Sequence, residues 1–239
     1  MVQRVAVVTG GSQGTGAAIA ARLLADGFDV ALTFTGDGDA AQRMADGIAV
    51  TGRRVLALRA DSGQVTDNSA MVARVMAEFG RIDVLVCAAG FQVPDGLPAA
   101  GLAAFLLDVA VRGTMLEAIA AADHMGRDGR MIFVAPASDV PSGVTGGPAV
   151  DAASLHGPAE AALTRFAQGL ARDLGPHGIT VNVVRPGPVG GVTQSGMVPP
   201  YYEAGDDLVD FVAFLASGPA GFISGATVVA ERSKTDAAA

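Results

Sequence analysis

The segment Val5–Gly16 constrains the fold most, because a short β-branched run breaks into a glycine-rich turn and then an Ala/Ile/Leu helix pattern. Glycines at positions 10, 14 and 16 allow a tight turn, a close backbone approach to a phosphate, and close seating of the helix on its strand. The free N–H groups at such a helix start suit a pyrophosphate. Because the turn follows a strand and precedes a helix, it predicts a dinucleotide-binding unit.

Strand-like runs and helical patterns alternate along the whole chain. We expect strands near 4–9, 29–35, 54–60, 82–88, 130–135, 179–184 and 226–230. We expect helices near 15–26, 39–50, 66–79, 98–124, 158–174 and 206–216. Strands that are apolar on both faces predict a parallel sheet covered by helices on both sides. With right-handed crossovers this is an α/β fold, a doubly wound Rossmann-type sheet with its ligand crevice at the carboxyl ends of the strands.

The domain organisation follows from what interrupts this alternation. No linker or charge block divides residues 1–230, so we expect a single domain of about seven strands. Two stretches rich in Gly, Pro and Ser, 137–154 and 186–205, follow strands and are predicted to overhang the crevice as substrate loops. The tail 231–239 is polar and then alanine-rich, and we expect it to be flexible.

Charge and residue counts exclude several classes of partner. The net charge is −8 and no Lys/Arg cluster occurs, which argues against nucleic acid and anionic membranes. No run reaches the roughly 18 apolar residues of a membrane span, and no signal peptide is expected. The single Cys87, at the end of an apolar strand, fits a reducing cytoplasm. Because His124, His156 and His177 are far apart, we expect no metal site, and a small molecule is the expected partner.

Several ordered segments carry a family resemblance. They are Thr9–Gly16, Ala60–Ser62, Leu85–Gly90, Asp108–Thr114, Gly178–Gly187, and Phe214–Ser217 before Ile223–Gly225. Together they resemble the short-chain dehydrogenase/reductase family over roughly residues 3–230. The resemblance implies an oxidoreductase that acts on carbonyl or alcohol groups and binds NAD(P)(H).

The resemblance also implies which residues contact the cofactor. The pyrophosphate would lie on the turn that contains Gly10, Ser12, Gln13, Gly14, Thr15 and Gly16. Asp61, followed by Ser62, would accept a hydrogen bond from the adenine amino group, although Asp61 has an equal alternative as a helix cap. Ala89 and Gly90 would lie against the adenosine ribose. The nicotinamide would meet Pro186, Gly187 and Val189.

The choice between NAD and NADP is read at the end of the second expected strand. An NAD enzyme usually places an acid there, whereas this chain has Phe34. The basic residues typical of NADP are missing as well, since Gln13 and Thr35 stand where an arginine often stands. Thr33, Thr35, Gln13 and Arg43 remain as groups that could bond a 2′-phosphate. The pattern leans towards NADP(H).

The family's proton relay is replaced at each of its four positions. His156 stands where the family has tyrosine, and Glu160 stands where it has lysine. Pro136 replaces the serine and Ala110 the asparagine. A missing oxyanion donor costs about 2.7–4 kcal/mol of barrier and a missing general acid about 10²–10⁴-fold in rate. We therefore expect ordinary ketone reduction to be weak or absent.

Substitute chemistry is open at this stage. His156 and Glu160, with four-residue spacing, could form an acid/base pair on one helix face. Pro158, however, predicts that the helix begins there and leaves His156 outside it, and Glu160 would then only complement the helix dipole. Ser138 and Asp139 could enter the pocket, or they could only shape their loop. One of Tyr201 and Tyr202 could serve as a proton donor, or both could only pack a lid.

Three functions therefore stay open. The first is an oxidoreductase with a rebuilt relay, and the second is a catalytically silent, cofactor-binding or oligomer-forming pseudoenzyme. The third is a non-redox lyase, isomerase or cyclase that uses His156. The resemblance further implies a homodimer or homotetramer that pairs through the helices near 98–124 and 158–174.

Overall fold

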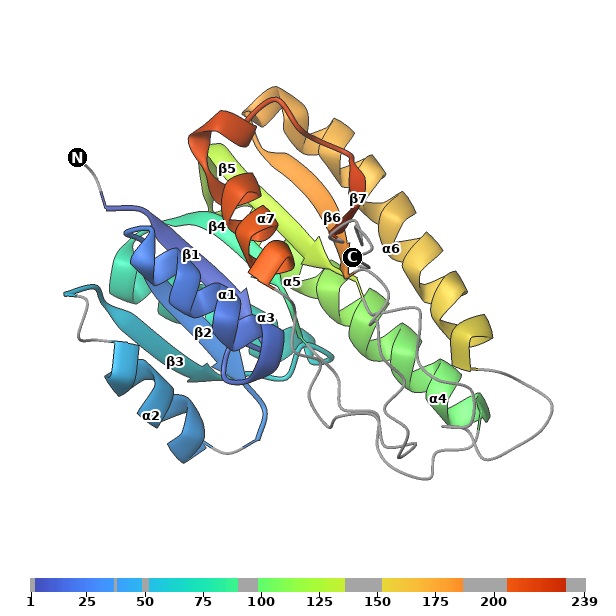
Figure 1. Ribbon diagram of the computed structural model, residues 1–239, viewed down its shortest axis with the longest axis horizontal. Coiled ribbons are helices and arrows are strands. Elements are labelled where there is room, and N and C mark those ends of the chain that lie inside the picture. Colours follow the sequence, from blue (N-terminus) through green and yellow to red (C-terminus); the bar gives the residue numbers. More distant parts are fainter. Residues whose placement is uncertain are drawn as a thin grey trace, which may run out of the picture.

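The chain forms one parallel sheet flanked by helices (Figure 1). The computed structural model describes residues 3–36, 38–48, 52–89, 99–135, 152–186 and 206–230. The strands are β1 (Val5–Thr9), β2 (Asp29–Phe34), β3 (Val55–Arg59), β4 (Ile82–Cys87), β5 (Met125–Val134), β6 (Thr180–Pro186) and β7 (Thr227–Ala230). Their order is β3-β2-β1-β4-β5-β6-β7, and every neighbouring pair is parallel. The order reverses between β1 and β4, so a ligand crevice belongs at the carboxyl ends of these two strands.

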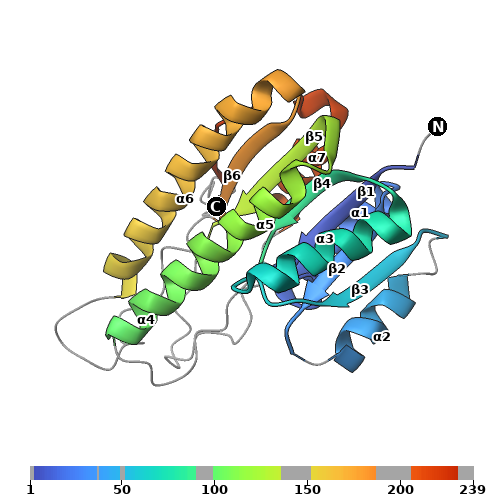
Figure 2. The same cartoon turned by 180° about the vertical axis from the view of Figure 1, so that it is seen from behind.

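Helices cover both faces of the sheet, as the apolar strands predicted. They are α1 (Gly14–Ala25), α2 (Gly38–Ile48), α3 (Val65–Phe79), α4 (Ala99–Leu106), α5 (Thr114–Ala122), α6 (Ala152–Leu174) and α7 (Asp206–Ala216). Two short 3-10 helices, η3 (Gly175–His177) and η4 (Gly218–Ala220), follow α6 and α7. One buried apolar cluster joins α1 and α7 to the sheet, and the other joins α3, α5 and α6 (Figures 1 and 2). Alternate strand residues supply the two clusters: Val7 faces one and Val8 the other.

The expected helix near 98–124 is one helical rod with a wider turn in its middle. A π-helical segment, η2 (Leu107–Gly113), separates α4 from α5. Single π turns are rare and frequently mark functional sites. Ala110, at the position where the family has its asparagine, lies inside this segment and is buried.

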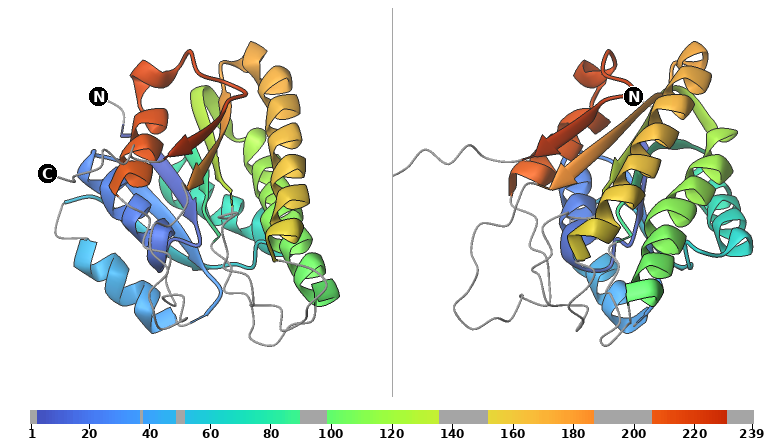
Figure 3. Two further views of the ribbon diagram at one scale, coloured as in Figure 1. Left: turned by 45° about the vertical axis from the view of Figure 1, so that its right-hand side comes forward. Right: turned by 90° about the vertical axis from the view of Figure 1, so that its right-hand side faces the viewer.

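The start of α6 corrects the sequence-based expectation. The helix begins at Ala152, so Pro158 lies inside it rather than at its start. A proline in a helix removes one N–H bond and usually kinks or ends it. Here α6 packs along β6 and beside the α4–η2 rod (Figure 3). These contacts offset the lost bond, and His156 lies in the same helix as Glu160.

The last crossover differs in hand from the others, which the assumption of right-handed crossovers did not foresee. Helix α6 lies on the α3/α5 face between β5 and β6, whereas α7 lies on the α1 face between β6 and β7. Since both connections step the same way across the sheet, their hands are opposite. The reason is coverage: α7 packs against β5 and β6 on the face that α4, α5 and α6 leave bare.

Candidate functional site

The turn after β1 is built so that a glycine is required at two points. Gly10 has φ +64°, and a Cβ on it would lie 2.7 Å from Ala89 Cα. A Cβ on Gly16 would overlap the carbonyl oxygen of Gly10, so the start of α1 rests directly on the turn. The Gly10 N–H donates to Thr33 Oγ1 (3.1 Å) and the Gly11 N–H to the Thr33 carbonyl (3.0 Å). These hydrogen bonds fasten the turn to β2, and Ala89, which follows β4, lies directly against it.

The outer surface of this turn faces the carboxyl edge of the sheet. Gln13 is the N-cap of α1, but its side chain makes no capping hydrogen bond. Gln13 and Gly14 are exposed, while Ser12 and Thr15 are half-exposed. The first turn of α1 is therefore presented at the switch point, where helix N–H groups and the helix dipole favour an anion.

The end of β2 carries no carboxylate. Phe34 is half-buried and Thr35 is exposed. Thr33, in contrast, is only 2% exposed, and its hydroxyl accepts the hydrogen bond from Gly10. Thr33 therefore supports the turn from beneath, and the expectation that it bonds a phosphate was wrong. Arg43 lies on the exposed face of α2.

The loop after β3 contains Asp61, which the sequence predicted either to contact the adenine or to cap a helix. Asp61 is exposed, and its Oδ1 accepts a hydrogen bond from the Gly63 N–H (2.9 Å). The N-cap of α3 is Gln64, so the alternative of a helix cap at Asp61 was wrong. Ser62 points inward instead: it is 8% exposed, and its hydroxyl donates to Glu117. After β4, Ala88 is buried and Ala89 half-buried.

The two predicted catalytic positions lie in the N-terminal half of α6. Glu160 Oε1 lies 2.9 Å from the Arg185 Nε, with the two side chains 17% and 28% exposed. Arg185 is next to last in β6, so the pair lies at the carboxyl edge of the sheet. His156 precedes Glu160 by one helical turn, but its side chain lies outside the described residues. The lysine position thus carries a carboxylate that is already paired with an arginine.

Of the predicted residues after β6, the structure places Pro186, which is the last residue of that strand. Other predicted residues lie outside the part of the chain that the structure describes: Gly90, Pro136, Ser138, Asp139, Gly187, Val189, Tyr201 and Tyr202. The substrate loops 137–154 and 186–205 fall largely in the same category.

Two residues of the carboxyl edge were missed in the sequence. Arg185 stood in a family segment but had no assigned role, and its pairing with Glu160 spans a helix and a strand that no local pattern connects. Glu117 could have been found, because it is the lone acid of the apolar helix α5 and falls on the face of the buried Thr114, Ala118 and Ala121. Burial raises the pKa of the Glu117 carboxyl, although hydrogen bonds from Ser62, Cys87 and Thr9 lower it.

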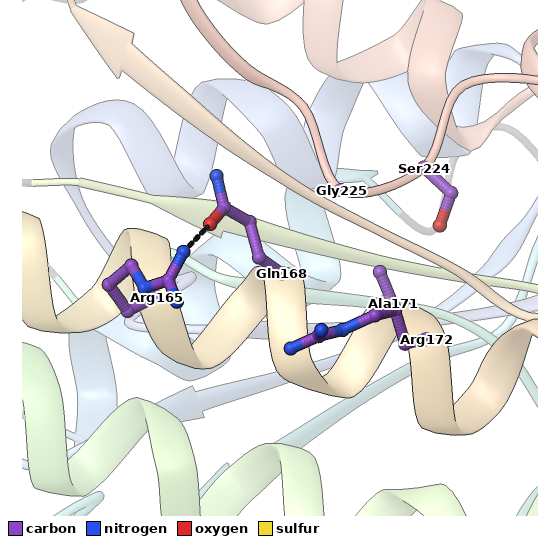
Figure 4. Close-up of a pocket in the computed structure, with 6 residues that line it drawn as sticks. All are labelled: Arg165, Gln168, Ala171, Arg172, Ser224 and Gly225. Atoms are coloured by element: carbon purple, nitrogen blue, oxygen red, sulfur yellow. Dashed lines mark hydrogen bonds between the residues drawn. The ribbon is translucent and has the colours of Figure 1, made fainter.

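A hollow of about 360 Å³ lies elsewhere on the molecule, beside the C-terminal half of α6. Arg165, Gln168 and Arg172 line it from the helix, with Ser224 and Gly225 opposite (Figure 4). Arg165 donates to Gln168 Oε1 (2.8 Å), and Ser224 Oγ accepts from the Val181 N–H (3.2 Å). Because the hollow adjoins the amino ends of β6 and β7, it is separate from the crevice at the carboxyl ends.

The described residues also bear on metal and membrane binding. Within the described ranges, no group of three or more His, Cys, Asp or Glu side chains could hold a metal ion. Every helix in these ranges is too short or too polar to span a bilayer.

Cys87 is a buried free thiol whose pKa is raised well above its ordinary value, first by burial and then by the neighbouring Glu117. A buried neutral thiol is a poor nucleophile.

Comparisons with known proteins agree with this geometry. The family model described as short chain dehydrogenase matches residues 4–198. Cyclohexanol dehydrogenase of Rhodococcus sp. is 30% identical over 94% of this chain and 93% of its own. The cyclic-di-GMP-binding biofilm dispersal mediator protein of Escherichia coli is 32% identical over 92% of both chains. The crystal structure of a short chain dehydrogenase from Burkholderia cenocepacia in complex with NADP is similar with a TM-score of 0.80, at 37% identity over 96% of this chain and 97% of that chain.

Proposed function

Since this chain belongs to the short-chain dehydrogenase/reductase family, we propose that it binds NADP(H) at the carboxyl ends of β1 and β4 but reduces ordinary ketones weakly or not at all. The single observation that carries the binding half is the turn from Gly10 to Gly16. Its backbone is fixed beneath by Thr33, and it presents the first turn of α1 outward. This cradle fits a pyrophosphate, and the bound nicotinamide would supply hydride chemistry.

The adenosine half of the cofactor would lie along the ends of β2, β3 and β4. Asp61 keeps one exposed oxygen edge beyond its bond to Gly63, so it can accept from the adenine amino group. Ala89 presents no bulky side chain to the ribose. The other proposed contacts are those predicted from the sequence: Ser12, Gln13 and Thr15 for the pyrophosphate, Gly90 for the adenosine ribose, and Pro186, Gly187 and Val189 for the nicotinamide.

The preference for NADP(H) rests on the end of β2. A carboxylate there would accept both ribose hydroxyls and repel a 2′-phosphate, and β2 ends in Phe34 instead. Exposed Thr35 and Gln13 can donate hydrogen bonds to a phosphate. The similar Burkholderia cenocepacia structure is a complex with NADP, which supports the same choice.

The proposed weakness in catalysis rests on the other end of the crevice. A lysine at position 160 would bring a cation to the nicotinamide ribose, whereas this chain has Glu160, paired with Arg185. Ala110 has no side-chain amide that could order a water. Among the four relay positions, position 156 carries an imidazole, a group whose ordinary pKa suits proton exchange in the pH range of most enzymes. Glu160 is a poor partner for it, because Arg185 already binds an oxygen of that carboxylate.

Two further functions stay as alternatives. A catalytically silent, cofactor-binding subunit is compatible with the lost relay, and one relative is named for binding cyclic-di-GMP rather than for a reaction. A non-redox lyase, isomerase or cyclase would use His156 as its acid or base. Neither alternative predicts hydride transfer between the cofactor and a substrate, whereas the main proposal does.

Binding is tested by nicotinamide fluorescence during titration with NADPH and with NADH. We expect saturation with both and tighter binding of NADPH. No saturation with either nucleotide would overturn the proposal and the cofactor-bound form of the silent subunit. Turnover on a broad panel of ketones and alcohols then separates the functions. Brisk reduction of a simple ketone by the unaltered protein would contradict the proposed weak catalysis, and His156→Ala tests any activity that is found.

The proposed assembly is a homodimer or homotetramer in the cytoplasm. The α4–η2–α5 rod and α6 lie side by side on one flank (Figure 3). Leu107 and Ile119 are large apolar side chains on this rod that are 49% and 58% exposed, as expected of a face that a second copy covers. Sedimentation that gives only a monomer would contradict this assembly.

A further inference from the structure

Glu117 is an anomaly in the core. It lies in α5, whose other buried residues are small or apolar apart from Thr114, and it is only 1% exposed. Burying a carboxyl group is costly unless hydrogen bonds compensate it. An apolar side chain at this position would avoid the free-energy cost of burying a carboxyl group, so the acid calls for a specific role.

The Glu117 carboxyl joins the ends of three strands. Its Oε2 accepts a hydrogen bond from Thr9 Oγ1 (3.1 Å), and Thr9 is the last residue of β1. Its Oε1 accepts from the Ser62 hydroxyl, in the loop that follows β3. The thiol of Cys87, the last residue of β4, also hydrogen-bonds to it. We name Thr9, Ser62, Cys87 and Glu117 the strand-end network.

Each partner of Glu117 adjoins an expected cofactor contact. Thr9 precedes Gly10, where the pyrophosphate turn begins, and Ser62 follows Asp61, the expected adenine contact. Cys87 lies two residues before Ala89, the expected contact of the adenosine ribose. The network therefore lies directly beneath the proposed adenosine half of the site, on the buried side of the same three backbone segments.

The sheet ladder already pairs Thr9 of β1 with Cys87 of β4, whereas the other side-chain bonds of the loop after β3 reach neither strand. The Ser62 carbonyl accepts from Asn68 Nδ2 (2.8 Å), and the Gly63 carbonyl accepts from Arg112 Nη1 (2.7 Å). These fix the loop after β3 to α3 and η2. Among the side-chain hydrogen bonds of the described residues, those of Glu117 alone link this loop to the ends of both β1 and β4.

We propose that Glu117 is a positioning residue that holds the ends of β1, β3 and β4 at the spacing that the adenosine and pyrophosphate half of NADP(H) requires. This inference rests on the proposed cofactor function. The carboxyl group never touches the cofactor and acts only through Thr9, Ser62 and Cys87. Its removal should therefore weaken binding of the adenosine half and leave the nicotinamide half alone.

The chemistry of the network determines which substitution is conservative. Three donors from Thr9, Ser62 and Cys87 face two carboxyl oxygens. Burial favours the neutral acid, which keeps one proton to donate within the network. A glutamine has the same shape, one acceptor oxygen and an amide donor, so it can replace the neutral acid. A leucine fills a similar volume and makes none of the bonds.

The test compares Glu117→Leu, Glu117→Gln and the unaltered protein. Equilibrium titrations use NADPH, adenosine 2′,5′-bisphosphate as the adenosine-side probe, and reduced nicotinamide mononucleotide as the other half. We expect Glu117→Leu to weaken the adenosine-side probe and NADPH by about tenfold, which is ~1.4 kcal/mol. Glu117→Gln should stay within about threefold, roughly the effect of one altered hydrogen bond. Binding of reduced nicotinamide mononucleotide should be the same in all three.

A stability control separates positioning from general damage. Val75→Ala truncates a fully buried side chain of the same apolar cluster, and Val75 makes none of the hydrogen bonds of the strand-end network. It should lower the melting temperature and leave the dissociation constants unchanged. If Glu117→Leu does not fold, Thr9→Val removes one donor with little change of shape and should weaken the adenosine-side probe by about threefold.

Amide hydrogen exchange of the cofactor-free protein gives a readout independent of binding. Glu117→Leu should speed exchange at residues 9–11, 61–63 and 87–89 relative to Val75→Ala. Unchanged affinity for the adenosine-side probe together with unchanged exchange would overturn the inference. If the unaltered protein bound no nucleotide, the proposed function would fail on its own. Exchange at the three strand ends would then decide whether Glu117 fixes them.

Discussion

The carboxyl edge of the sheet divides into two regions built on different principles. Around β1, β2, β3 and β4, the site is made of backbone turns supported from below by buried hydrogen bonds, such as that from Gly10 to Thr33. Around β6 and α6, it depends on individual side chains, and there Glu160 pairs with Arg185. A binding cradle made of backbone survives exchange of most side chains. A proton relay made of four side chains does not, because each one carries its own chemistry.

The comparison would be tested most severely by rebuilding the second region while leaving the first untouched. The rebuilt variant combines Ala110→Asn, Pro136→Ser, His156→Tyr, Glu160→Lys and Arg185→Ala. We expect it to raise NADPH-dependent ketone reduction by about 100-fold or more, since a positioned general acid contributes about 10²–10⁴-fold. Steady-state turnover on a panel of simple ketones measures the gain.

The matched control keeps Arg185 and makes the other four substitutions. The introduced lysine would then face the guanidinium that now pairs with Glu160, and two cations at that distance destabilise each other. We expect a smaller gain than with Arg185→Ala. Equal gains would mean that Arg185 does not reach the relay position. No gain in either variant would mean that the pocket itself, and not only its side chains, differs from the family.

In the first region the largest effect is expected from Gly10→Ala. The new Cβ would lie 2.7 Å from Ala89 Cα on a residue with φ +64°. Backbone strain and overlap together should lower the free energy of unfolding by about 2–3 kcal/mol and weaken NADPH binding by at least about tenfold. Thermal unfolding and fluorescence titration measure the two effects.

A helical glycine provides the control for that substitution. At Gly47 in α2, no atom lies within 4 Å of the position that a new methyl group would take, so Gly47→Ala should leave NADPH binding unchanged. Stability should be unchanged or rise by about 0.5–1 kcal/mol, as alanine is the better helix former. If Gly10→Ala bound NADPH as tightly as Gly47→Ala does, the turn would not be the cradle.

The same division explains what the sequence could predict. Strand positions, the sheet class and the glycine turn follow from local patterns. These are apolar runs that alternate with helical patterns, and glycines between the first strand and the first helix. The start of α6 did not follow, because Pro158 is a strong local signal that packing against β6 and the α4–η2 rod outweighs. The pairing of Glu160 with Arg185 also escaped prediction, because it joins two elements through tertiary structure alone.

Glu117 is a different kind of omission, since its signal was present. A lone acid at the spacing of buried residues on an apolar helix is visible in Thr114–Ala122. What the sequence does not contain is the identity of its partners. Thr9, Ser62 and Cys87 come from three strand ends that only the folded sheet brings together.

A smaller effect should distinguish the Glu160–Arg185 pair from a surface contact. Because both side chains are mostly buried, Glu160→Gln should lower the free energy of unfolding by about 1–2 kcal/mol by leaving a guanidinium poorly compensated. Arg185→Met should cost a similar amount. The double variant should lose less than the sum, with a coupling of about 1 kcal/mol from denaturant unfolding. If the losses of unfolding free energy in the two single variants simply added up in the double variant, Glu160 and Arg185 would not interact in the folded protein.

The pH dependence of stability gives the finest comparison, because it isolates one group in the first region. Burial raises the folded-state pKa of Glu117 above its ordinary value of 4.5, so the folded protein holds a proton that the unfolded chain releases. Stability from this group should fall as pH rises from about 4.5 to the folded pKa, by at most about 1.4 kcal/mol per pH unit, and then level off. Glu117→Gln carries no such proton, so its unfolding free energy should lack this slope, and its stability relative to the wild type should rise as the pH increases over this range. Denaturant unfolding of both proteins between pH 4 and 9 measures the difference. Parallel curves would mean that Glu117 ionises in the fold as readily as in water, and the neutral strand-end network would have to be abandoned.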